Sequence, residues 1–248
     1  MRNISAIILA KDEERNIGPC IQSLRGIAEV IVVDTGSADR TMEVARQAGA
    51  RVVSEQWLGF AAQRRQSLGH ARHDWALFID ADERLSPDLL AHLLALQPAP
   101  GTEGYWLRRR NYFLGRAMKN SRWADDWQMK LFLKDKAAIE PVAVHEGVTV
   151  HGAKQRIGTG VIEHDTVPSL RRYLDKLNRY TALEARQKFE AGQRFSLAKM
   201  VLSPGAEFWK LYLALGCWRD GLRGLAIAAL SALYKLLTLG KLMELERG

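Results

Sequence analysis

The segment Trp75-Ala76-Leu77-Phe78-Ile79-Asp80-Ala81-Asp82-Glu83 decides the fold. Its first five residues form an uninterrupted apolar run of strand length, which is typical of a strand buried on both faces. The run then stops abruptly at an acidic cluster. Strands of this kind belong to parallel sheets covered by helices, where ligands bind at the carboxyl ends of the strands. The segment therefore predicts an α/β fold with an acidic crevice at the end of this strand.

The same alternation of apolar runs and polar, helix-like stretches fills the chain on both sides of this segment. Spacing and turn residues predict strands over 5–10, 30–33 and 51–54, and helices over 14–24, 41–49, 61–71 and 87–96. Such alternation is typical of parallel strands joined by crossover helices. We expect a mostly parallel sheet flanked by helices. Asp34 follows the second strand directly, so it should converge with the 80–83 cluster on one crevice.

The acidic cluster offers hard oxygen ligands at the point where a divalent cation and a diphosphate could meet. Asp80 and Asp82 alternate as the chain leaves the strand. Mg²⁺ or Mn²⁺ suits such ligands, since two or three protein groups suffice when waters and substrate phosphates complete the shell. The alternative is a solvated acidic turn that caps the helix beginning at Pro87. An Asp-x-Asp tripeptide alone does not decide between the two.

Three motifs in order give a resemblance to the family 2 glycosyltransferases over residues 3–146. They are 9–17, with the sequence LAKDEERNI; 32–41, with VVDTGSADRT; and 77–83, with LFIDADE. The resemblance implies the GT-A fold, a Rossmann-like arrangement. It also implies roles for single residues: a border to the nucleotide base for Ala10, Lys11 and Glu13, a uracil or ribose contact for Asp34, a ribose contact for Asp80, and metal coordination for Asp82. Arg64 matches a basic residue that faces the nucleotide, although an exposed arginine on an amphipathic helix would look the same.

The middle of the chain resembles, more narrowly, the lipopolysaccharide core glucosyltransferase subgroup. The matching segments are 108–115 (RRRNYFLG), 123–132 (WADDWQMKLF) and 144–146 (VHE). The resemblance implies that Asp126 is the catalytic base, although the adjacent Asp125 leaves the choice open. Glu146 is the alternative base. His145 is either a metal or diphosphate contact or a structural histidine.

The expected reaction is an inverting transfer of a hexose, by resemblance glucose from UDP-glucose, to a lipid-linked saccharide of the bacterial lipopolysaccharide core. One carboxylate deprotonates the acceptor hydroxyl while a metal stabilises the departing diphosphate. Residues 105–136 include nine basic and three acidic residues. This excess of positive charge favours a phosphorylated acceptor. The alternatives are a membrane-associated nucleotide-sugar-binding scaffold without turnover, and a sugar-phosphate nucleotidylyltransferase. The latter should carry a glycine-rich loop after the first strand, where this chain has Lys11-Asp12-Glu13-Glu14.

Composition and charge favour an anionic partner without naming it. The chain has 248 residues, 47% of them hydrophobic, and a formal net charge of +8. Nucleic acid, an acidic membrane or a phosphorylated substrate would each fit. We expect no nucleic-acid partner, because no recognition-helix or zinc-finger pattern accompanies the charge. The two isolated cysteines predict a reducing compartment, and the first apolar run is too short for a signal-peptide core.

A composition change predicts two domains, a nucleotide-sugar-binding catalytic domain over 1–165 and a basic, helical segment over 166–248. From residue 165 to the end, the chain has fourteen Lys or Arg residues and eight Asp or Glu residues. The longest uncharged stretch, 224–234, would span only about 16 Å as a helix, short of the ~30 Å hydrocarbon core. We therefore expect amphipathic helices that lie on an anionic membrane surface, with ordinary packing on the catalytic domain as the alternative. The expected location is cytoplasmic, peripheral on the inner face of the cytoplasmic membrane.

Overall fold

The computed structural model describes residues 3–120, 123–124, 126–139 and 147–247. The chain divides into two compact units. The first comprises Met1–Arg110 and Asp126–Asp165, and the second comprises Asn111–Asp125 and Thr166–Gly248. A long strand of the sheet, β6 (Thr102–Phe113), begins in the first unit and ends in the second.

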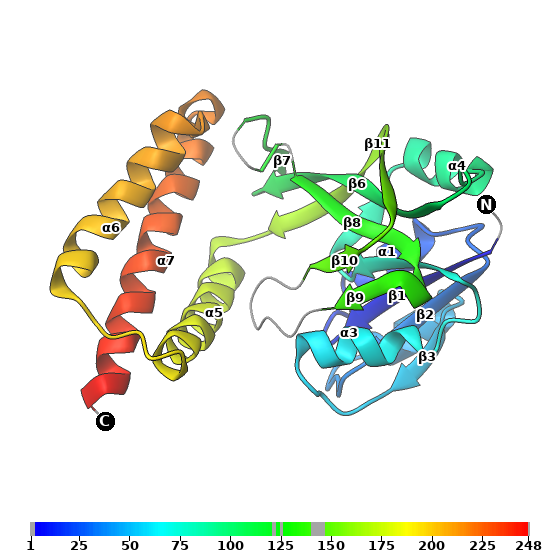
Figure 1. Ribbon diagram of the computed structural model, residues 1–248, viewed down its shortest axis with the longest axis horizontal. Helices are drawn as coiled ribbons and strands as arrows, with labels where there is room; N and C mark the ends of the chain where they lie inside the picture. Colours follow the sequence, from blue (N-terminus) through cyan, green and yellow to red (C-terminus); the bar gives the residue numbers. More distant parts are fainter. Residues whose placement is uncertain (1–2, 121–122, 125, 140–146, 248) are drawn as a thin grey trace. The chain divides into compact units, whose positions relative to one another are not determined.

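The first unit is built on a sheet whose parallel half is contiguous (Figure 1). This half has the order β3-β2-β1-β4, with β1 at Ile4–Ala10, β2 at Glu29–Asp34, β3 at Arg51–Ser54 and β4 at Trp75–Asp80. All three pairings in it are parallel, as the crossover pattern predicts. The order continues as β8-β6-β11-β5, with β7 paired to β6; the new bounds are β5 Glu83–Leu85, β7 Arg116–Ala117, β8 Asp126–Leu133 and β11 Ala153–Val167.

The strands beyond β4 add antiparallel pairings that the sequence pattern does not reveal. β8 pairs antiparallel with both β4 and β6, and β11 pairs antiparallel with β5. A second, two-stranded sheet joins β9 (Ala137–Ile139) to β10 (Val148–Val150). The predicted α/β fold is confirmed, and the antiparallel strands bring residues from the middle of the chain to the end of β4.

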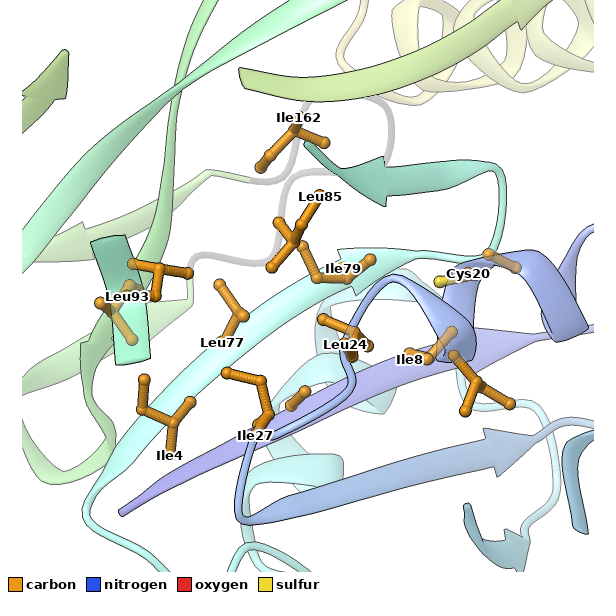
Figure 2. Close-up of a cluster of buried hydrophobic side chains, with 14 of the residues drawn as sticks. Ile4, Ile8, Cys20, Leu24, Ile27, Leu77, Ile79, Leu85, Leu93 and Ile162 are labelled. Atoms are coloured by element: carbon orange, nitrogen blue, oxygen red, sulfur yellow. The ribbon is translucent and has the colours of Figure 1, made fainter. Parts of the chain in front are cut away.

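Alternation along β1 separates the two faces of the sheet. Ile4, Ala6, Ile8 and Ala10 belong to one buried cluster and Ile7 to the other, as the period of two residues requires. Helices α1 (Ile17–Gln22), α2 (Thr41–Gln47) and α4 (Pro87–Ala95) contribute to the first cluster, whereas α3 (Phe60–Leu68), β9 and β10 contribute to the second. Figure 2 shows the first cluster, where Cys20 and Leu24 face the β4 residues Leu77 and Ile79.

The second unit is mainly helical. It contains α5 (Leu170–Glu190), α6 (Leu197–Trp209), a π-helical turn η2 (Lys210–Ala214), a 3₁₀ turn η3 (Cys217–Asp220) and α7 (Leu222–Arg247). Within this unit α7 packs against both α5 and α6 and lies between them (Figure 1). Asp220 holds the chain at Lys119 and Asn120, because its carboxylate accepts hydrogen bonds from their backbone amides at 3.2 and 3.1 Å.

One helix of this unit is long and continues through charged positions. Arg223 and Lys235 interrupt its apolar run, yet α7 continues through both for 26 residues. By length and composition alone α7 could cross a membrane, although such a match is weak evidence.

Candidate functional site

Three predicted site residues meet where the parallel strands end. In the register of the sheet, Ala10 of β1 pairs with Asp34 of β2, and Leu9 pairs with Asp80 of β4. Neighbouring strands lie about 4.8 Å apart, so the backbones at Asp34 and Asp80 are separated by roughly 10 Å across β1. The parallel strands therefore bring the predicted nucleotide-binding residues to one edge of the sheet.

The loop after β1 is tied to the loop after β2 by a set of short polar contacts. Asp12 adopts a left-handed backbone, with φ 56°, which Asp tolerates better than most residues. Its amide donates to Ser37 Oγ at 2.9 Å, and its carboxylate accepts from the amide of Ala38 at 2.8 Å. The amide of Glu13 donates to Thr41 Oγ1 at 2.7 Å. These contacts hold the two loops as one polar rim, with Lys11 exposed on it.

Asp34 is fully buried and accepts hydrogen bonds from the loop that forms part of this rim. Its Oδ2 accepts from the amides of Gly36 and Ser37 at 3.0 and 3.1 Å. The left-handed conformation of Gly36, with φ 91°, lets the chain turn back over the carboxylate. Asp34 thus shapes the loop, and its expected contact with uracil or ribose stays a prediction.

Asp80 ends β4 between two cations. Its Oδ1 accepts from Arg64 Nη2 of α3 and its Oδ2 from Lys130 Nζ of β8, each at 3.0 Å. Burial alone would raise the pKa of the Asp80 carboxyl, but Lys130 and Arg64 outweigh it and hold this pKa well below its usual range. Asp80 therefore stays ionised at neutral pH, and its ion pair with Arg64 holds that side chain at the end of β4.

A chain of ion pairs connects Asp80 to Asp126, and we call it the ion-pair ladder. Lys130 Nζ also donates to Glu83 Oε2 at 2.7 Å, and Glu83 Oε1 accepts from Arg109 Nη1 of β6 at 3.3 Å. Arg109 then holds Asp126 Oδ2 with Nε at 2.7 Å and Nη2 at 2.6 Å. Glu83 and Lys130 are both buried. The ladder therefore fixes the predicted base relative to the end of β4.

Burial in this region also perturbs the nearby thiol. Cys20 of α1 is fully buried, and its Sγ lies 3.6 Å from the carbonyl oxygen of Asp80. Burial, followed by the negative charges of Glu83 and Asp80, raises the pKa of the Cys20 thiol far above its ordinary value. Cys20 is therefore a packing residue here and not a nucleophile.

Asp82 lies beside a histidine from the antiparallel half of the sheet. Its side chain is 26% exposed, and its Oδ2 lies 3.5 Å from Nε2 of the buried His164. The two meet because β11 pairs with β5, which places His164 opposite Glu83. An oxygen ligand and an imidazole nitrogen thus lie together at the rim of the cluster.

Comparison with known proteins agrees with this geometry. The sequence profile of Glycosyl transferase family 2 matches residues 5–153, which include the parallel strands, the acidic cluster and Asp126. The chain belongs to glycosyltransferase family 2. It is 32% identical to the lipopolysaccharide core biosynthesis glycosyltransferase LpsC of Rhizobium meliloti, over 97% of this chain and 92% of that protein. An uncharacterized glycosyltransferase of Rickettsia typhi, RT0209, is 27% identical over 99% of this chain and 88% of its own length.

A solved structure matches part of the chain. Glucosyl-3-phosphoglycerate synthase from Mycobacterium tuberculosis, in complex with Mn²⁺, UDP and glucosyl-3-phosphoglycerate, is 29% identical with a TM-score of 0.36. The match covers 45% of this chain and 44% of that one. The chain therefore spans less than half of the length of that synthase.

The side chains of this family 2 glycosyltransferase fit a metal ion only if phosphate oxygens of the substrate supply further ligands. Within the described ranges, no three His, Cys, Asp or Glu side chains come together closely enough to hold a metal ion. Asp80 is engaged by two cations, whereas Asp82 offers carboxylate oxygens at the rim. Mg²⁺ and Mn²⁺ accept one or two carboxylates plus substrate phosphates and water. The residues thus fit a metal held by Asp82 and a bound diphosphate.

The sequence patterns gave no role to four side chains that the structure brings into this cluster. Glu83, Lys130 and Arg109 carry the ion-pair ladder, and His164 contacts Asp82. Arg109 and Lys130 lie inside two of the three segments that resemble the lipopolysaccharide core subgroup, which was the available signal. His145, Glu146 and Asp125 lie outside the described residues, so their predicted roles stay predictions.

Proposed function

We propose that this glycosyltransferase transfers glucose from UDP-glucose, with inversion, to a heptose or similar sugar of a lipid-linked lipopolysaccharide core acceptor. The proposal includes a requirement for Mg²⁺ or Mn²⁺ and a place on the cytoplasmic face of the inner membrane. It rests on one observation above all: the ion-pair ladder joins Asp80, beside Asp82, to Asp126, so that donor-binding and base functions share one cluster.

The transfer is a single displacement. Asp126 takes the proton of the acceptor hydroxyl as its oxygen forms a bond to the anomeric carbon of glucose, and the bond from that carbon to the diphosphate oxygen breaks. UDP leaves with the electron pair. Arg109 orients Asp126 for this step from one side, and Gln128 Nε2 donates to its Oδ1 at 2.5 Å from the other. A carboxylate held at both oxygens presents a fixed direction to the acceptor.

The donor would lie over the polar rim. Lys11 and Glu13 border the base, Asp34 shapes the loop that faces the ribose, and Arg64 approaches the diphosphate while it pairs with Asp80. A metal ion bound by Asp82, with His145 as a second candidate ligand, would neutralise the charge that develops on the diphosphate. His164 steadies Asp82 by its contact at 3.5 Å.

The acceptor and the location are supported by likeness and by charge. LpsC, which is similar over nearly the whole chain, is named as a lipopolysaccharide core biosynthesis enzyme. The basic excess between residues 105 and 136 suits a phosphorylated core sugar. A lipid-linked acceptor is confined to a membrane, and the basic segment over 166–248 suits contact with its anionic surface.

The proposal is tested with purified full-length protein, a panel of UDP- and GDP-sugars, Mg²⁺ or Mn²⁺, and a lipopolysaccharide core acceptor lacking its outer sugars. We expect transfer from UDP-glucose, with the product mass and the anomeric configuration read by mass spectrometry and NMR. Asp82→Asn should lose the metal-stimulated rate. Equal rates for Asp82→Asn and wild type would defeat the metal assignment. Tight UDP binding without transfer to any acceptor would show a scaffold instead of an enzyme.

A further inference from the structure

The outward side of α6 exposes large apolar residues where a soluble helix normally exposes polar ones. Val201 and Leu202 are 68% and 69% exposed, and Trp209 is 56% exposed. Leu197 and Leu213 are exposed as well. We call these five residues the α6 face. Contiguous exposed apolar residues are uncommon on soluble proteins and mark an interaction surface.

The α6 face follows the helical repeat. At 100° per residue, Leu197, Val201, Trp209 and Leu202 fall within an arc of about 140°, and Leu213 follows four residues after Trp209 in the π-helical turn. Beyond the left-handed turn at Gly216, Trp218 and Leu222 extend the exposed apolar surface. The other side of this region is used inside the unit, where Leu211, Cys217 and Ala228 form a buried cluster.

The long helix α7 is tied to α5 by polar contacts. Lys241 Nζ donates to Asn178 Oδ1 at 2.6 Å and to Thr181 Oγ1 at 2.8 Å, both on α5. Tyr234 is hydrogen-bonded to Glu184 of α5. Since α5 is strongly charged and packs along α7, both helices belong outside the hydrocarbon of a membrane. Among the described residues of this unit, the large apolar side chains that are at least half exposed belong to the α6 face or are Trp218 and Leu222, whereas the exposed leucines of α5 and of the rest of α7 are less exposed.

The basic side chains around the α6 face favour an anionic partner. Lys199 and Lys210 border the apolar arc, and Arg219 lies near its end, with its guanidinium 5.3 Å from the centre of the Trp218 ring. The nearby Asp220 is occupied with the backbone amides of Lys119 and Asn120. Basic residues at the border of an apolar, tryptophan-bearing helix face suit the headgroup level of an anionic bilayer.

We propose that the α6 face, with Trp218 and Leu222, is the membrane-docking surface of the chain, that it lies in the interface of an anionic bilayer, and that α7 does not span it. The docking surface would account for the proposed location on a membrane. It rests on the proposed function only for its biological setting. Leu197, Val201, Leu202 and Trp209 enter the boundary between headgroups and acyl chains. Lys199, Lys210 and Arg219 meet lipid phosphates.

The test uses the full-length protein and vesicles of phosphatidylcholine, with or without phosphatidylglycerol, in a co-sedimentation assay. The double variant Val201→Gln/Leu202→Gln removes the centre of the α6 face at exposed positions, so folding should be retained and is checked by thermal unfolding. Its matched control is Leu174→Gln/Leu183→Gln, two exposed leucines of α5 in the same unit. We expect partitioning onto phosphatidylglycerol vesicles to fall about tenfold or more in the α6 variant and to stay near wild type in the control.

Several outcomes would overturn the proposal. These are absence of wild-type binding to phosphatidylglycerol vesicles, equal losses in the two double variants, or release of wild type only by detergent and not by high salt, which would indicate a spanning helix. A wild-type dimer that becomes a monomer in the α6 variant, with no change in vesicle binding, would make the face an interface between copies. Transfer to a detergent-dispersed acceptor should be the same in all variants, so this proposal can fail while the proposed activity stands.

Discussion

The two units treat charged and apolar side chains in opposite ways. The first unit buries Glu83 and Lys130 and pairs them with Asp80 and Arg109, whereas the second unit leaves Val201, Leu202 and Trp209 open to solvent. Each arrangement departs from the rule that charges lie outside and large apolar groups inside. Buried ion pairs contribute little net stability, and exposed apolar faces contribute none. The departures therefore indicate where function lies, in chemistry for one unit and in binding for the other.

The largest effect should come from the base at the end of the ladder. Asp126→Asn keeps the shape of the side chain but removes its proton acceptor, so we expect kcat to fall about 10³-fold. The dissociation constant for UDP-glucose should stay close to wild type, as measured by calorimetry. Asp135→Asn, in the 3₁₀ turn Lys134–Lys136 that follows the other end of β8, is the control and should keep full activity. If both variants are equally active, the ladder does not lead to the base.

Removal of the buried cation tests whether the ladder is held together by paired charge. Lys130→Met leaves Asp80 and Glu83 without their shared partner, and we expect the free energy of unfolding to fall by about 3–5 kcal/mol. Urea unfolding followed by circular dichroism measures this. Arg40→Met, which removes an exposed pair with Glu43, should have no measurable effect. Equal stability of the two variants would remove the contrast between buried and exposed charge.

A substitution of His164, which lies beside Asp82, tests the assignment of Asp82 as a metal ligand. His164→Gln leaves a polar group near Asp82 but removes the imidazole, so we expect the Mn²⁺ concentration at half-maximal rate to rise roughly tenfold. The rate at saturating Mn²⁺ should recover most of the wild-type value. His92→Gln, on α4, is the comparison and should leave the Mn²⁺ requirement unchanged. A loss in His164→Gln that Mn²⁺ does not restore would indicate a different role.

The smallest effect concerns pH. Lys130 and Arg64 hold the pKa of Asp80 below its unfolded value, so its stabilising contribution is fully present above the unfolded pKa and is lost as pH falls through the folded pKa. The difference in unfolding free energy between wild type and Asp80→Asn should therefore be constant above about pH 5 and shrink below about pH 4. Urea titrations from neutral pH downwards measure it. A difference that grows on acidification would contradict the assigned ion pairs.

Local patterns were sufficient to predict the parallel strands and the convergence of Asp34 with the acidic cluster. Apolar runs and turn residues determine each strand, and parallel order brings the strand ends together. The ion-pair ladder depends instead on the register of β6 and β8, in which Arg109 pairs with Asp126. No local periodicity encodes that register. No bounds were predicted for α7, in which Arg223 and Lys235 interrupt the apolar run without ending the helix, because Arg and Lys are good helix formers.

The most direct test of the central claim is the position of a metal ion in crystals grown with Mn²⁺ and UDP, located by its anomalous scattering. The account predicts a manganese peak bound directly by the carboxylate of Asp82 and by the diphosphate. Asp126 should lie beside the same diphosphate. A manganese ion bound away from Asp82, or a diphosphate on a surface that the ion-pair ladder does not reach, would contradict it.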